Sequence, residues 1–111
     1  MPVTTNCLLV ISTCPDKHCA DTIAAALVEG GHAACVNIVP GLTSVYRWQG
    51  RIERDSEWLL LAKTTSDAYP RVEETVSRLN PNELPEIIAL PVERGLADYL
   101  QWVVQQTAQE D

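Results

Sequence analysis

The 111 residues, 46% of them hydrophobic, are enough for one domain with its own core and leave no room for a second. Fifteen acidic residues against eight basic ones give a net charge of −7, which disfavours nucleic acid and anionic membranes as partners. The longest N-terminal apolar run, residues 7–11, is too short for a signal peptide or a membrane span. We therefore expect a cytoplasmic protein whose four cysteines stay reduced.

The N-terminal third of the chain predicts a strand followed by a helix. Residues 7–12, "CLLVIS", are apolar without alternation, which is typical of a strand covered on both faces. Pro15 keeps the residue before it out of helical geometry, and Asp16 is placed to cap the helix that follows. That helix is expected to end at Gly30 and Gly31.

The middle of the chain predicts a long hairpin. A second strand starts at Ala33, is kinked at Pro40–Gly41, and turns at Gln49–Gly50. Its partner, "RIERDSEWLLLAKT", is polar towards the turn and apolar away from it. Each arm is far longer than the usual strand of about five or six residues, so the domain cannot cover all of it. The outer half either folds back over its own domain or pairs with another copy. We favour a homo-oligomer, because a long unpaired edge invites aggregation.

The C-terminal third predicts a helix, a strand and a last helix. Ser66–Asp67 is placed to cap the second helix, which has Pro70 in its first turn. A strand is expected over residues 86–92 and a helix over about 97–107. The order β-α-β-β-α-β with an added helix predicts a single α+β domain over residues 1–111. This domain is a ferredoxin-like sandwich with helices on one face of an antiparallel sheet.

The segment "TCPDKHC" contains a candidate metal site formed by Cys14, His18 and Cys19. Thiolate and imidazole are the ligands that copper and other soft cations prefer. The alternative is a loop cysteine, a surface histidine and a partly buried helix cysteine, because no CxxC pair is present. Cys14 also precedes a helix N-terminus, where a thiol can have a lowered pKa and be redox-active.

A second candidate site involves two charged residues beside apolar strands, Lys63 and Glu86. They are either solvated strand ends, or they face a cleft between subunits together with Cys35, Tyr46 and Trp48. Such a cleft would suit a small polar or anionic ligand. No GxSxG, HExxH or P-loop motif is present, so we do not expect an enzyme or an obligatory cofactor.

Five segments resemble the CutA divalent-cation tolerance family: "TCPD", "AACVNIVPGLTSVYRWQGRIE", "LLLAKTT", "LPEIIALPV" and "DYLQWV". The match as a whole, including the buried strand before "TCPD", runs from about Cys7 to Val103. The resemblance implies a homotrimer in which the hairpin contributes to intersubunit sheets, an architecture similar to the PII signalling proteins. It also implies a role in tolerance to copper and other divalent metals.

The metal ligands ascribed to that family do not carry over. Their positions fall at Ser12, Leu79 and Asn80, and none of these is a soft ligand. Two functions therefore stand side by side. One is a trimeric metal-tolerance protein that binds or senses the ion weakly, and the other is a PII-like module that binds a small ligand between subunits.

Overall fold

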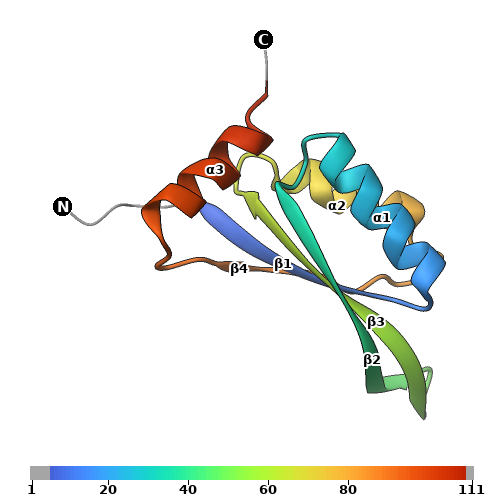
Figure 1. Ribbon diagram of the computed structural model, residues 1–111. Coiled ribbons are helices and arrows are strands. Elements are labelled where there is room, and N and C mark those ends of the chain that lie inside the picture. The colour runs from blue at the N-terminus through green and yellow to red at the C-terminus, as the bar shows by residue number, and fades with distance from the viewer. Residues whose placement is uncertain (1–5, 110–111) are drawn as a thin grey trace.

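The structure, a computed structural model, describes residues 6–109 as four strands and three helices (Figure 1). In chain order they are β1 (Cys7–Cys14), α1 (Lys17–Glu29), β2 (Cys35–Trp48), β3 (Arg51–Thr65), α2 (Tyr69–Leu79), β4 (Ile87–Pro91) and α3 (Ala97–Thr107). The predicted α+β class and element order are confirmed, with boundaries within about two residues of expectation. No helix in this described part of the chain is long and apolar enough to cross a membrane.

The four strands form one antiparallel sheet in the order β2-β3-β1-β4. Helices α1 and α2 lie side by side on one face of it (Figure 1). The main core lies between these two helices and the sheet. Alternate strand residues such as Val10, Leu60 and Ala62 pack there with Ile23 of α1 and Val76 of α2. We call this side of the sheet the helix face.

The opposite side of the sheet, which we call the open face, is covered at one end only. There α3 packs Val103 and Leu100 against Cys7. By strand alternation the open face carries a row of aliphatic side chains that α3 does not cover. Half-buried members come from β1 and β3, and Ile88 and Leu90 of β4 are 51% and 47% exposed. The members on β1, β3 and β4 are Leu9, Ile11, Leu59, Leu61, Ile88 and Leu90, and Val39 of β2 lies beside Leu59 on the same face.

The hairpin extends beyond the rest of the sheet, as its length predicted (Figure 1). β1 pairs with β3 only from Trp58 to Thr65, so the outer half of β3 has β2 as a neighbour on one side alone. The longest dimension of the described chain is 49 Å. The expected kink at Pro40–Gly41 is confirmed as a shift of register between Val39 and Leu42. Gly41 takes a φ of 82°, a value that favours glycine.

The predicted capping residue is confirmed at the start of α1 and is wrong at the start of α2. Asp16 caps α1 by accepting a 2.8 Å hydrogen bond from the Cys19 amide. The expected cap from Ser66–Asp67 is wrong, because α2 begins later, after Ala68, and no side chain of its N-cap residue caps it. Thr65 instead accepts from the Ala68 amide at 3.2 Å. A buried residue at the end of β3 therefore anchors the turn that leads into α2.

We expect Asp16→Ala to lower the free energy of unfolding by about 1 kcal/mol, because the Cys19 amide loses its acceptor. Urea denaturation at one fixed protein concentration measures the change and keeps any self-association constant. The control is Asp21→Ala, which removes only an exposed ion pair with Lys17. That variant should lose less than half as much, and equal losses would contradict the capping role.

Candidate functional site

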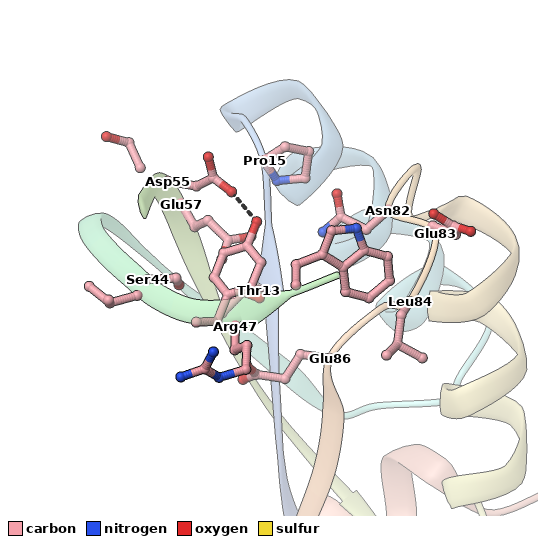
Figure 2. A pocket seen from close by; sticks show the side chains of 14 residues that line it. Thr13, Pro15, Ser44, Arg47, Asp55, Glu57, Asn82, Glu83, Leu84 and Glu86 are labelled. Atoms are coloured by element: carbon pink, nitrogen blue, oxygen red, sulfur yellow. Dashed lines mark hydrogen bonds between the residues drawn. The ribbon is translucent and has the colours of Figure 1, made fainter. Parts of the chain in front are cut away.

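An open pocket of about 780 Å³ lies where the hairpin leaves the rest of the sheet (Figure 2). Its walls come from three segments that are distant in sequence. The end of β1 supplies Thr13 and Pro15, the hairpin supplies residues 44–48 and 55–57, and the loop before β4 supplies residues 82–84 and Glu86. The pocket therefore depends on the hairpin and this loop standing on either side of the end of β1.

The loop before β4 is held in place by two side chains, one at the end of β1 and one at the end of α2. Ser12 donates a 2.7 Å hydrogen bond to the Glu86 carbonyl. The Asn80 side chain donates to the Thr13 carbonyl and accepts from the Asn82 amide, both at 3.0 Å. Ser12 and Asn80 are positions at which the resemblance would have placed metal ligands. Here they hold the pocket wall by hydrogen bonds.

The charge of the pocket is predominantly negative. Asp55, Glu57, Glu83 and Glu86 line it, and Arg47 is the one basic residue among the lining residues. Figure 2 shows these carboxylates distributed around the rim, with Asp55 and Glu57 on the hairpin and Glu83 across from them. Tyr46 and Trp48 add aromatic surface. The pocket is thus suited to a cation, by carboxylate attraction and by the ring faces.

Tyr46 is tied to one of these acids. Its hydroxyl donates a hydrogen bond to Asp55 (Figure 2). This bond to a carboxylate raises the pKa of Tyr46 to about 12, with smaller contributions from desolvation and from the neighbouring acids Glu53 and Glu57. Tyr46 therefore stays a neutral donor throughout the physiological range and keeps its ring fixed at the pocket wall.

The five residues predicted to share a cleft are split in this chain. Tyr46, Trp48 and Glu86 line the pocket, whereas Cys35 and Lys63 pair across β2 and β3 away from it. The Lys63 ammonium donates to Asn37 and lies 4.0 Å from the Cys35 sulfur. Within one chain, Lys63 therefore lies apart from the pocket that Glu86 lines. A cleft between subunits that contains all five residues stays a prediction.

The structure buries two of the three predicted soft ligands in the main core. Cys14 and Cys19 are both buried there, while His18 is exposed on the first turn of α1. In residues 6–109 no group of three or more His, Cys, Asp or Glu side chains is arranged to hold a metal. The site of three ligands stays a prediction, and its histidine is the member that stands apart.

The expectation of a lowered pKa at Cys14 is wrong. Burial is the main cause that raises the pKa of this thiol to about 12, and the nearby Cys19, Glu57 and Asp16 add to it. Burial also raises the pKa of Cys19. The helix N-terminus is thus outweighed by loss of water, and neither thiol is an activated nucleophile.

Several pocket residues were not among the predicted site residues, namely Arg47, Asp55, Glu57, Asn82, Glu83 and Leu84. A signal for two of them was present, because Asp55 and Glu57 alternate on the polar half of the β3 sequence. The contribution of the loop could not be read from the sequence. It depends on hydrogen bonds between residues 67 and 74 positions apart.

The fold and pocket define a small α+β protein with an acidic pocket, and comparison with known proteins identifies its family. The family model described as "CutA1 divalent ion tolerance protein" matches residues 8–106. This chain belongs to that family, as its sequence resemblance predicted.

Individual relatives agree with this assignment. The divalent-cation tolerance protein CutA of Thermus thermophilus is 54% identical over 89% of this chain and 96% of its own. Human protein CutA is 50% identical over 86% of this chain, which spans only 53% of the human protein. The solved structure of the Thermus thermophilus protein has a TM-score of 0.90 at 52% identity, covering 92% of this chain and 99% of that one. CutA1 from Oryza sativa has a TM-score of 0.91 at 36% identity, covering 96% and 98%.

We expect Asp55→Asn to lower the pKa of Tyr46 from about 12 towards its ordinary value of 10.0, because the hydrogen bond to a charged acceptor is lost. A pH titration of the ¹³C-labelled tyrosine ring by NMR measures it. Glu53→Gln is the control, since Glu53 acts on Tyr46 through charge alone and should produce a smaller decrease. If the two variants gave equal decreases, the Tyr46–Asp55 hydrogen bond would not be the main cause.

Proposed function

We propose that this chain acts in tolerance to divalent cations, copper among them, as a cytosolic homotrimer that binds or senses the ion weakly and catalyses no reaction. The observation that carries the proposal is the acidic pocket of a member of the CutA1 family. Relatives named divalent-cation tolerance proteins support the role. Four carboxylates against one guanidinium support attraction of a cation.

Weak binding is favoured over a closed metal site by the arrangement of the ligands. The pocket is open, and its carboxylates are spread over the hairpin and the loop before β4. A hydrated cation could be held there by charge while exchanging quickly with solvent. A closed site would need about three or four ligands at one point, and the described residues offer no such group.

Self-association is supported by the open face and by the unpaired strand edges, and the family resemblance is what implies three subunits. The apolar row of the open face has no cover within the described chain beyond α3. β2 is an edge strand along its whole length, and the outer half of β3 is unpaired on the side where β1 ends. Large apolar surface and free edges of this kind are covered by other subunits in stable oligomers. The strand order also supports the ferredoxin-like description of the fold.

We expect Glu83→Gln/Glu86→Gln to weaken Cu²⁺ binding about 30-fold, since each of the two carboxylates contributes roughly 1 kcal/mol in water and about 1.4 kcal/mol is a factor of ten in affinity. Isothermal calorimetry in a non-coordinating buffer measures the affinity. The control is Glu29→Gln/Glu93→Gln, which removes the same charge from exposed positions outside the pocket. Equal weakening in both variants would mean that only the net charge of the chain attracts the ion, and would contradict the proposal that the pocket binds it.

We expect the wild-type chain to have a solution mass of three times 12.2 kDa, and Ile88→Glu/Leu90→Glu to shift it towards a single chain. Burying two carboxylates in the apolar open face would cost more than the interface gains. Sedimentation velocity measures the mass. Val28→Glu is the control, because this residue is also exposed but lies on α1, away from the open face. A wild-type monomer, or a trimer that survives both charges, would contradict the proposal.

The second candidate function is a PII-like module that binds a small molecule, and the aromatic part of the pocket favours it. Tyr46 and Trp48 stand beside the acids, which is an arrangement suited to an organic cation. The polar or anionic ligand expected for a cleft between subunits with Lys63 would need a different site, because Lys63 does not line this pocket. A thermal-shift screen of amines against the wild type and Trp48→Ala separates this function from metal binding.

A further inference from the structure

The C-terminal end of α3 is joined to the rest of the fold by one side chain of α2, away from the acidic pocket. This end lies beside the turn after α1 and the start of α2 (Figure 1). The Arg71 guanidinium of α2 donates through Nη2 to the Thr107 carbonyl of α3 at 3.1 Å. Its Nε donates to Nδ1 of His32, in the turn after α1, at 3.2 Å. Arg71 therefore links three segments of the chain.

Arg71 gives the end of α3 a donor and a positive charge that the sequence of this helix lacks. The last turn of α3 contains no basic residue. The last carbonyls of a helix have no partner within it, and the helix dipole makes this end negative. The guanidinium bonded to the Thr107 carbonyl therefore stabilises the last turn of α3.

The imidazole of His32 is fixed in the position that presents Nδ1 to Arg71. The His32 carbonyl accepts a 2.6 Å hydrogen bond from the Thr64 hydroxyl, and its amide donates to the Leu27 carbonyl at 2.9 Å. The ring lies over Gly30, where a β-carbon would come within 2.5 Å of Nε2. Glycine at this position therefore leaves the space that the ring occupies.

The hydrogen bond between Arg71 and His32 requires a neutral imidazole. A guanidinium can only donate, so Nδ1 must be the acceptor and the ring proton must lie on Nε2. A second proton would convert Nδ1 into a donor and place an imidazolium against the guanidinium. β3 and α3 contribute the Thr64 hydroxyl and the Thr107 carbonyl to this junction, and both are uncharged.

No acidic side chain offsets a positive charge on His32. Within residues 6–109 no carboxylate forms a hydrogen bond or an ion pair with His32 or Arg71. Glu74, on the next turn of α2, pairs with Arg78, and Glu29 at the end of α1 is exposed. Protonation of His32 would therefore leave two positive charges in contact, and the hydrogen bond to Arg71 would be lost.

We propose that His32 is a pH-sensitive switch for the C-terminal end of α3. Neutral His32 holds Arg71 on the Thr107 carbonyl, and uptake of one proton from solvent by Nδ1 releases it. The stabilisation is thus present at high pH and is lost as the pH falls through the range of about 5 to 8 in which histidine changes its charge. Since α3 covers one end of the open face through Val103, fraying of its last turn weakens this cover. The switch requires neither a trimer nor a bound cation, so its test is independent of the proposed function.

The test is hydrogen exchange of the α3 amides in the full chain at about pH 7.5 and about pH 5, at one protein concentration. Rates are corrected for the intrinsic exchange rate at each pH. Protection of the amides of residues 105–107 should be about tenfold lower at the lower pH, which is the effect of one hydrogen bond to a charged group. His18→Gln is the matched control, because His18 is the other histidine of the chain and is exposed on α1. That variant should keep the pH dependence of the wild type.

Two variants and one spectrum assign the effect to the junction. His32→Asn places an uncharged oxygen where Nδ1 lies, and Arg71→Ala removes the donor, so each should show the same protection at both pH values. ¹⁵N NMR of the wild-type imidazole at about pH 7.5 should show the His32 proton on Nε2.

Four outcomes would each overturn the proposal. They are a His32 proton on Nδ1 at the higher pH, wild-type protection that does not change with pH, wild-type pH dependence in His32→Asn or Arg71→Ala, and loss of that dependence in His18→Gln. The wild-type measurements decide the question even where a variant does not fold.

Discussion

The unequal pairing of β3 is the constraint on which the rest of this structure depends. β2 accompanies β3 along its whole length, but β1 pairs with it only from Trp58 onward. The inner half thus becomes the centre of the sheet, and the outer half becomes a projecting two-stranded ribbon (Figure 1). The pocket exists because this ribbon leaves the sheet beside the end of β1. The open edges that favour an oligomer arise from the same mismatch of lengths.

The end of β1 contributes to both the pocket and the core because alternate residues of a strand point to opposite faces. Thr13 lines the acidic pocket, and Cys14, the next residue, is buried in the core beneath α1. The carboxylates of the pocket and the buried thiol of Cys14 therefore lie on opposite faces of the sheet at this strand end.

The fold could be predicted from the sequence because its signals are local. The spacing of apolar residues, Pro15 with Asp16, and the pair Pro40–Gly41 each specify a feature that the structure contains. The prediction of a helix cap at Ser66–Asp67 was wrong because Thr65, a buried strand residue, accepts the hydrogen bond from the Ala68 amide at the start of α2. The site was harder to predict, since Ser12 and Asn80 position its wall across long sequence separations. Lys63 looked like a site residue by charge alone, and its pairing with Asn37 could be seen only in the folded sheet.

The positions that the family resemblance assigns to metal ligands have another role in this chain. The positions at which the resemblance placed metal ligands are filled by Ser12, Leu79 and Asn80. Ser12 and Asn80 hold the loop before β4, and Leu79 packs against the core. Two of the three positions thus stabilise the wall of the acidic pocket through hydrogen bonds, and the third contributes to the core. The carboxylates that favour a cation in this chain lie in that pocket, on the hairpin and on the loop that Ser12 and Asn80 position.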